Sequence, residues 1–570
     1  MLRLNKYSEI DFDEYVRHLE HLGFLYYEYD SMSFVQRKME QEIFTISDLV
    51  YRTMLECTAG KVIGISRNNV IRFLTGFMGV PESLLYSQKR DADSGETITT
   101  LSIDEKHLSK VYDKGYAKEF IDYYLSLKSK IAKNGYIKSC MSQFQDSGGI
   151  KNSKGNELYK VTHSISQNAT LRTYYKQFSH QQLAREALVS IGVPDGYTIV
   201  KGDFAQSDLK IVYNMLLRDK SNIDIMYNCE DSYEGIARIC EGSEFNIEKF
   251  KEERHLYKEN TLAPVYGAES AVTTDAQKIV NNVNSMLQTL PVYNEFKNRI
   301  KRKVECGLPV YVTTYFGNKI EIESTFKGSK EVIDAALNAP AQAGTSEIIA
   351  ACANAIMRRF AKHGITADNG GIYLYLNRHD ELVFLLNNKY LEYSWIFQDT
   401  EDILVDDWMP LKIEFSFSDN YAIDNPVIDN LCKSYYKEME PINVKQLIEK
   451  GRNCEFFIPC EDTLVLYCGT YSEGDRTVIC FVNKDTDKVT YKEVNTSNAD
   501  QLVKSIVQMM SEVRMELFDK DITSVCIYTT LVVEDTSISK GIPVVFKRDF
   551  EDDMYRRVHE LAHEKFNETL

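Results

Sequence analysis

The chain has 570 residues, of which 44% are hydrophobic and 26% are charged, and this length and balance predict a soluble protein of several packed units. It has no apolar run long enough for a membrane-spanning helix, and its first residues show no signal peptide. Its net charge is −17, but residues 401–570 hold 19 basic and 33 acidic side chains, which leaves 48 basic and 51 acidic before them. The acidic excess therefore lies in the tail, and the rest of the chain can carry a basic groove for nucleic acid.

Residues 1–60 are expected to form a helical segment, to which we assign no task. Helices are also predicted at 68–78, 102–112 and 117–134. The stretch 101–140 holds five acids and eight lysines, at positions 106, 110, 114, 118, 128, 130, 133 and 138. The simplest interpretation is a solvated helix face, and the alternative is a surface that follows nucleic-acid phosphates.

A strand predicted at 197–203 ends in Asp203, and a helix at 209–217 follows it. Two strands are predicted within 311–322 about a Gly-Asn turn, and two more at 371–376 and 381–386. The other elements predicted in this part are helices at 232–239, 247–266 and 345–360.

The character of the chain changes after about residue 430. Strands are predicted at 455–459, 463–468, 477–482, 489–494 and 524–533, with a helix at 498–518. This order predicts a separate acidic α/β domain over 430–570, and it resembles a ribonuclease-H-like fold. Because the segment shows no convincing set of carboxylates, we expect it to dock a protein.

Two acids are expected at the ends of neighbouring strands. Asp203 follows one strand, and His379-Asp380-Glu381 joins two others. Taken alone, such acids are most often solvated turn residues. Together, two strand-end carboxylates are what a pair of Mg²⁺ ions needs, because Mg²⁺ prefers hard oxygen ligands and retains water.

A cationic helix face is predicted between these acids. Arg254, Lys258, Leu262 and Tyr266 recur every four residues, so they share one face of a helix. A helical stripe is usually core, but two cations are poor core residues. Two charges and a ring suit a nucleoside triphosphate. Gly267 then permits a turn or a close approach.

These segments, in this order, resemble motifs A, B and C of the family A DNA polymerases. The motifs are Asp203…Asp208, Arg254-x3-Lys258-x7-Tyr266-Gly267 and His379-Asp-Glu381. The segment 338–349, Asn-Ala-Pro-Ala-Gln-Ala-Gly-Thr-Ser-Glu-Ile-Ile, is similar to a fourth motif of the family. The resemblance covers about residues 64–400.

The resemblance implies the catalytic roles. Asp203 and Asp380 would be ligands of two Mg²⁺ ions, with the Phe204 carbonyl completing the site. Glu381 would be an auxiliary acid near the primer end, and Lys258 would contact the α-phosphate and protonate the leaving pyrophosphate. Positioning and electrostatics would supply most of the acceleration.

The resemblance also implies the substrate contacts. The expected dNTP contacts are Arg254, Lys258, Leu262, Tyr266, Asp208, Gln206 and Tyr233. The expected contacts with primer–template DNA are Arg172, Gln342, Asn338, His379 and Gly267. Among these, Arg254 would hold the terminal phosphate, Tyr266 would stack near the templating base, and Gln206 would reach the minor groove or the primer end.

Some positions depart from the family pattern. Asp208 replaces the glutamate that excludes the ribose 2′-hydroxyl, so sugar selectivity is open. Leu262 replaces an aromatic ring, and Tyr233 replaces a histidine that helps to bind phosphate. Lys210 replaces an arginine and loses its planar fork. Pro264 removes an N–H and should bend its helix.

The implied fold is α+β: the right-hand polymerase fold, with a helical thumb, a β-sheet palm, helical fingers and the extra C-terminal domain. The expected divisions are 1–60 (N-terminal helices), 61–195 (thumb and palm entry), 196–230 (palm, motif A), 231–305 (fingers, motif B), 306–425 (palm, motif C) and 430–570 (acidic domain).

Two alternatives remain beside a DNA-directed DNA polymerase: a single-subunit RNA polymerase, against which Asp208 and Glu381 argue, and an inactive replisome scaffold. The 3′–5′ exonuclease domain of the family is expected to be missing, with Asp11-Phe-Asp13-Glu14 a helix-capping cluster. This compact form resembles a bacteriophage replication enzyme, which would act in the host cytoplasm. The twelve cysteines are scattered along the chain without metal-ligand spacing, so we expect them to be free thiols in a reducing compartment.

Overall fold

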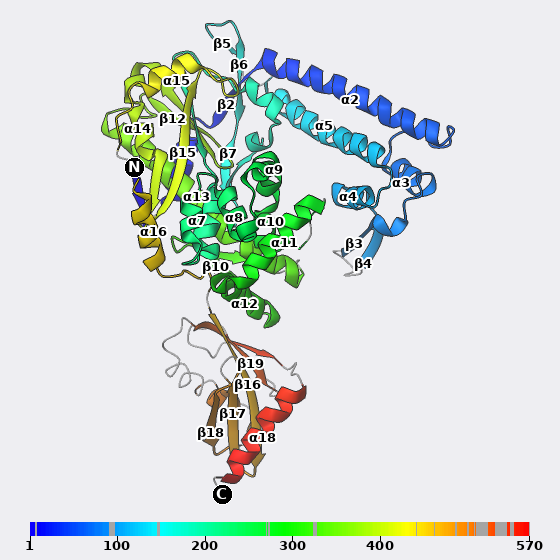
Figure 1. The fold of residues 1–570 in the computed structure, drawn as a ribbon, viewed down its shortest axis with the longest axis vertical. Coiled ribbons are helices and arrows are strands. Elements are labelled where there is room, and N and C mark those ends of the chain that lie inside the picture. Colours follow the sequence, from blue (N-terminus) through cyan, green and yellow to red (C-terminus); the bar gives the residue numbers. More distant parts are fainter. Residues whose placement is uncertain are drawn as a thin grey trace.

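A six-stranded sheet forms the centre of the larger of two units in the computed structural model (Figure 1). The structure describes the chain except residues 6, 7, 9, 91–96, 145–148, 270, 272–273, 323–327, 440–441, 461, 485–486, 497, 499–500, 507, 509–521, 530–543, 548–551 and 569–570. In spatial order the strands are β1 (Leu2–Leu4), β14 (Asp402–Val405), β15 (Met409–Ser418), β9 (Tyr197–Phe204), β13 (Glu381–Asn387) and β12 (Ile372–Arg378). Only the β1–β14 pair of this sheet is parallel.

A long helix, α13 (Ser329–Lys362), packs against β12 and joins the core of the sheet. It also contacts α1 (Phe12–Glu20), α6 (Ser207–Val212) and α14 (Trp395–Glu401). The helix predicted at 345–360 is thus confirmed, but it begins well before this range. Pro340 lies inside it, and burial of Ala336, Leu337 and Ala339 offsets the hydrogen bond that the proline cannot donate.

A helical arm projects from the sheet (Figure 1). Its two long helices, α2 (Tyr29–Cys57) and α5 (Lys118–Ser142), pack along each other, and its end carries α3 (Arg67–Gly76), α4 (Glu105–Asp113), β3 (Tyr86–Arg90) and β4 (Thr97–Leu101). The arm has a core of its own. Lys130 and Lys138 form ion pairs with Glu42 and Glu40 of α2, so part of the lysine cluster joins the two helices.

A helical lobe stands beside the sheet. It contains α8 (Ser232–Glu241), α9 (Ile247–Asn260), α10 (Leu262–Val265), α11 (Thr274–Thr289) and α12 (Pro291–Glu305). The helix predicted at 247–266 is therefore two helices. The break falls at Thr261, which keeps right-handed helical backbone angles (φ −78°, ψ −43°). Pro264, three residues later, has no N–H to donate to the helix at this point.

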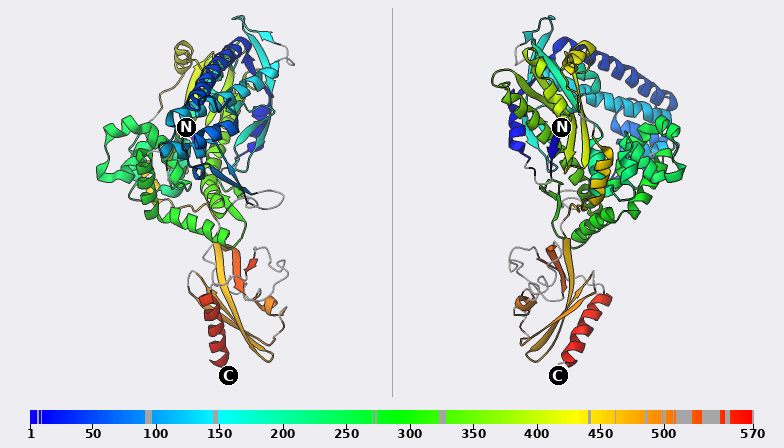
Figure 2. Two further views of the ribbon diagram at one scale, coloured as in Figure 1. Left: turned by 90° about the vertical axis from the view of Figure 1, so that its right-hand side faces the viewer. Right: turned by 60° about the vertical axis from the view of Figure 1, so that its left-hand side comes forward.

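The C-terminal unit holds a five-stranded sheet in the order β18-β17-β16-β19-β20. Its strands are β16 (Asp462–Glu473), β17 (Arg476–Asn483), β18 (Val489–Val494), β19 (Ile522–Thr529) and β20 (Val544–Lys547), and α18 (Asp552–Glu568) covers one face. β16, β19 and β20 are mutually parallel, and β17 is antiparallel to its neighbours. Figure 2 shows this unit below the larger one, and Figure 1 shows α12 as the helix of the larger unit beside it.

The strand predicted at 455–459 is wrong. This segment is irregular, and at its start the Arg218 guanidinium donates to the carbonyls of Cys454 and Glu455 at 3.3 and 3.1 Å. The segment 509–518 of the predicted helix lies outside the described residues. Among the helices that the structure describes, none has the length and apolar character that crossing a membrane requires.

Candidate active site

Asp203 and Asp380 meet at the ends of adjacent strands. Glu381 lies directly opposite Asp203 in the β13–β9 register, and the Phe204 N–H donates to the Asp380 carbonyl at 3.2 Å. Both aspartates are exposed. Burial and the charges of Asp380 and Glu414 raise the pKa of Asp203, while Lys258 opposes this shift. Two carboxylates and a lysine therefore share one electrostatic site.

Two left-handed residues form the turns at this site. Gln206 (φ +57°) turns the chain from β9 into α6, and His379 (φ +56°) forms the tight turn between β12 and β13. Non-glycine residues seldom adopt this conformation, and such residues concentrate at functional sites. The two turns bring the motif A and motif C acids to the same edge of the sheet.

Glu381 is held in place by the hydroxyl of Tyr421. The Tyr421 hydroxyl donates to its carboxylate at 2.5 Å, and Lys201 lies 5.8 Å from the Tyr421 ring centroid. Burial raises the pKa of Glu381, and the Tyr421 hydrogen bond and Lys201 oppose the shift. Glu381 is thus a fixed side chain, unlike its exposed neighbour Asp380.

A third acid, Glu414, flanks Asp203 on the other side. It lies opposite Asp203 in the β15–β9 register, so the side chains of Glu381, Asp203 and Glu414 form a row across three strands. Lys412 forms an ion pair with Glu414 at 3.4 Å. The sequence analysis missed this residue, although the alternation of apolar and polar residues over 409–418 was a usable strand signal.

The four residues predicted to share one helix face lie on two successive helices. Arg254 and Lys258 are exposed on α9, and Leu262 and Tyr266 continue the face, partly buried, on α10 and at its end. Arg254 pairs with Asp231, and its guanidinium lies 5.9 Å from the Tyr233 ring centroid.

Gln206 joins the sheet to the lobe. Its side-chain amide donates to Asp231 at 3.1 Å and accepts from the Ser232 N–H at 2.7 Å. The same Asp231 carboxylate binds Arg254, so one network connects the motif A turn with the start of α8 and the middle of α9.

Asp208 is fixed through both carboxylate oxygens. One accepts a hydrogen bond from the Thr345 hydroxyl of α13, and the other lies 3.3 Å from the Arg172 guanidinium. Burial raises the pKa of Asp208, against the effects of Thr345 and Arg172. Burial and the charge of Asp208 also raise the pKa of Tyr266, whose hydroxyl is buried with no hydrogen-bond partner among the described residues.

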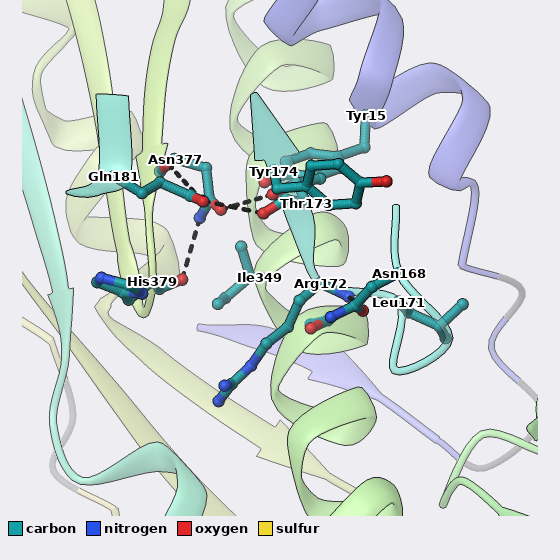
Figure 3. A pocket seen from close by; sticks show the side chains of 11 residues that line it. Tyr15, Asn168, Leu171, Arg172, Thr173, Tyr174, Gln181, Ile349, Asn377 and His379 are labelled. Atoms are coloured by element: carbon teal, nitrogen blue, oxygen red, sulfur yellow. Dashed lines mark hydrogen bonds between the residues drawn. The ribbon is translucent and has the colours of Figure 1, made fainter. Parts of the chain in front are cut away.

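Arg172 and His379 line a cavity of about 150 Å³ (Figure 3). Gln181 closes one side of it, donating to the Thr173 and Asn377 carbonyls at 3.0 and 3.1 Å. Ser346 of α13 also lines it.

Three predicted DNA contacts lie along α13. Gln342, partly buried, stands one turn before Ser346, whose hydroxyl donates to the Gln342 carbonyl at 3.0 Å. Asn338 stands one turn earlier, and its side-chain oxygen is buried without a partner among the described residues. Gly267 (φ +99°) lies against the same helix, where an added Cβ would come within 2.0 Å of the Asp334 carboxylate. Gly267 is therefore required for close packing.

The donor set suits a hard divalent cation. Asp203 and Asp380 supply adjacent carboxylates whose mutual repulsion a bound cation would offset. In the part of the chain that the structure describes, no group of three or more His, Cys, Asp and Glu side chains could hold a metal ion. A site here would therefore rest on two carboxylates and a backbone carbonyl, with water and substrate as further ligands.

Comparison with known proteins identifies the family and the fold of the larger unit. The family model described as DNA polymerase family A matches residues 74–422. The solved POL domain of Pol1 from M. smegmatis, in complex with DNA primer-template and dNTP, is 16% identical with a TM-score of 0.54, over 72% of this chain and 69% of that chain. No curated protein matches. The likeness to the solved domain confirms the right-hand polymerase fold.

Proposed function

The chain belongs to DNA polymerase family A, which makes it a nucleotidyltransferase, and we propose that it extends a primer 3′-hydroxyl with deoxynucleoside monophosphates on a DNA template. The observation that carries this proposal is the adjacency of Asp203 and Asp380 at two strand ends, with Lys258 close enough to oppose the pKa rise of Asp203. Acids beside a cation-bearing helix suit phosphoryl transfer, in which positioning and charge do most of the work.

Asp203, Asp380 and the Phe204 carbonyl are proposed to hold two Mg²⁺ ions. Bound there, these ions supply the charge that activates the primer hydroxyl and stabilises the leaving pyrophosphate. Glu381, held by Tyr421, positions the primer end beside them.

The lobe is proposed to bind the triphosphate. Lys258 contacts the α-phosphate and gives a proton to the leaving pyrophosphate, and Arg254 holds the terminal phosphate. Because Arg254 pairs with Asp231, the incoming phosphate must compete with that carboxylate for the guanidinium. Leu262, Tyr233 and Tyr266 line the nucleoside side of this site, and Gln206 keeps the motif A turn in register with it.

Asp208 is proposed to exclude the ribose 2′-hydroxyl, since Thr345 and Arg172 fix its carboxylate beside Tyr266. Arg172, Gln342, Asn338 and His379 are proposed to contact the duplex. Arg172 would then serve both the duplex and the sugar site.

We also propose that this chain has no proofreading exonuclease. Asp11 caps α1, accepting from the Glu14 N–H at 2.8 Å, and Glu14 pairs with Arg358 of α13. These carboxylates are therefore engaged in structural contacts. The acidic C-terminal unit is proposed to contact proteins of a replisome.

Primer extension on a defined template with Mg²⁺ tests the proposed function. We expect wild type to add dNTPs and to leave the primer intact when nucleotides are omitted. Asp203→Asn and Asp380→Asn should each lose roughly a thousandfold or more, because several kcal/mol of transition-state stabilisation disappear. Asp368→Asn, whose side chain is 91% exposed, is the matched control and should keep full activity.

Other results would contradict the proposal in distinguishable ways. A preference for ribonucleotides would indicate an RNA polymerase, and extension of neither substrate class would indicate a scaffold. Shortening of the labelled primer, abolished by Asp11→Asn, would refute the missing exonuclease.

A further inference from the structure

A second hollow opens beside Glu381. It has a volume of about 450 Å³, and its polar lining includes Arg185, Lys201, Arg378 and Tyr421. Arg185 begins a short helical turn (Arg185–Ser190), Lys201 is on β9, and Arg378 ends β12. Three separate elements thus bring cations to one hollow, and none of these cations belongs to the motifs discussed above.

The charges of the hollow favour an anion. Its acids are Glu186 and Glu381, and the Tyr421 hydroxyl already binds the Glu381 carboxylate at 2.5 Å. The ion pair of Lys201 with Asp424 is 3.5 Å long, and that carboxylate is 84% exposed. Arg185 is exposed at the rim of the hollow. A phosphate oxygen would therefore find the Lys201 ammonium and the Arg185 guanidinium accessible.

The position of the hollow limits which anion can reach it. Lys201 precedes Asp203 by two residues on β9, so the two side chains share a face about 6.8 Å apart. A nucleic-acid strand whose 3′ end lies at Asp203 and Glu381 would therefore pass the hollow within a few nucleotides of that end.

We propose that Arg185, Lys201 and Arg378 form a binding site for the phosphodiester backbone of the primer strand, within a few nucleotides of its 3′ end. The inference rests on the proposed function, because it takes the primer end to lie at Asp203. It assigns this hollow to the primer strand of the duplex. The hollow is distinct from the cavity that Arg172 and His379 line.

The test measures the affinity of the full-length protein for a labelled primer–template by fluorescence anisotropy at several salt concentrations. Arg185→Gln, Lys201→Gln and Arg378→Gln should each raise Kd roughly five- to tenfold at 0.1 M salt, and make the log–log salt slope shallower by about 0.7 to 0.9. Lys362→Gln is the control, because this exposed lysine ends α13 about 26 Å beyond Thr345 along the helix.

A modified primer makes the test specific for one strand. A neutral methylphosphonate at the second or third linkage from the primer 3′ end should weaken binding by wild type and have little further effect on Arg185→Gln. The same change in the template strand should affect both proteins equally. Arg185 is exposed, so this variant also avoids a folding defect, which thermal unfolding will verify.

The inference fails if Arg185→Gln keeps the wild-type salt slope, or if the primer methylphosphonate weakens both proteins equally. It also fails if the variants raise only the KM for dNTP, which would assign the hollow to the nucleotide. Loss of primer extension by wild type would instead refute the proposed function, so the two failures are distinguishable.

Discussion

Glu347 is a buried acid that the proposed chemistry does not use. It accepts hydrogen bonds from Thr314 at 2.7 Å and Asn318 at 2.6 Å, which hold the turn between β10 (Val310–Thr313) and β11 (Lys319–Ile322) against α13. Burial nevertheless raises the pKa of Glu347 to about 7. The folded protein therefore keeps a proton there that the unfolded chain releases near pH 4.3.

This shift predicts a pH dependence of stability. Because the folded state binds more protons between about pH 4.3 and 7, the free energy of unfolding falls as pH rises through that window and is level above it. Relative to Glu347→Gln, wild type should lose about 2 to 3 kcal/mol between pH 5 and 8 in urea unfolding. Glu321→Gln, an exposed acid on β11, should leave the wild-type pH dependence in place. If Glu347→Gln shows that dependence too, the assignment is wrong.

At the residue scale, the sequence predicted acids at strand ends and cations at helical spacing. Asp203, Asp380 and Lys258 follow from such local patterns. The partners of these residues do not, because they depend on strand register and on contacts across the fold. Glu414 flanks Asp203 only through the β15–β9 register, and Arg172 meets Asp208 across 36 positions of sequence.

At the element scale, close packing in the C-terminal unit depends on Gly469. An added Cβ there would lie 2.6 Å from the backbone of Val558 in α18, so the helix sits directly on the central strand β16. Gly469→Ala should destabilise this unit by roughly 1 to 3 kcal/mol, since a backbone contact cannot yield as a side chain does. Thermal unfolding of the full chain measures the effect.

The control for this prediction is Gly135→Ala. Gly135 is inside α5 with nothing within 4 Å of its missing Cβ, so alanine should be neutral or stabilising there.

Primer extension by Gly469→Ala should match wild type, because the contact lies outside the larger unit. Equal unfolding of Gly469→Ala and wild type would show that α18 does not sit on β16.

Strands with a clear local sequence pattern were predicted correctly. Short strands that depend on pairing with distant segments were not. The strands at 197–203 and 381–386 were confirmed, and each contains a short run rich in β-branched or apolar residues, at 198–200 and 382–386. β1 and β14 are too short to show a period, and they exist because they pair with each other at the sheet edge. The segment 455–459 has a strand-like composition but is irregular, and Arg218 binds the carbonyls of Cys454 and Glu455 where it begins.

At the scale of the whole molecule, the C-terminal unit is joined to the lobe through α12. Arg302 of α12 lies 3.6 Å from Asp462, Arg299 donates to the Cys460 carbonyl at 3.3 Å, and Lys547 donates to the Glu305 carbonyl. A basic helix thus meets an acidic unit. The sequence predicted the extra domain and its acidity, but its docking place could not follow from either, because it depends on a few contacts between distant segments.

A pair of thiols at this joint offers a test of the arrangement. Cys306 ends α12 and Cys526 lies in β19, 3% and 0% exposed, in one small cluster with Leu308 and Val465. The hydrogen bond from the Cys526 thiol, with Lys547 and Lys484, lowers the pKa of Cys306. At pH 8 diamide, which takes up the two hydrogens, should therefore oxidise the pair to a disulfide, found as a linked 306–526 peptide by mass spectrometry. Cys306→Ala should abolish that peptide, whereas Cys352→Ala, buried in α13, should retain it. If wild type forms other disulfides but not this one, the two units do not meet at α12 in solution.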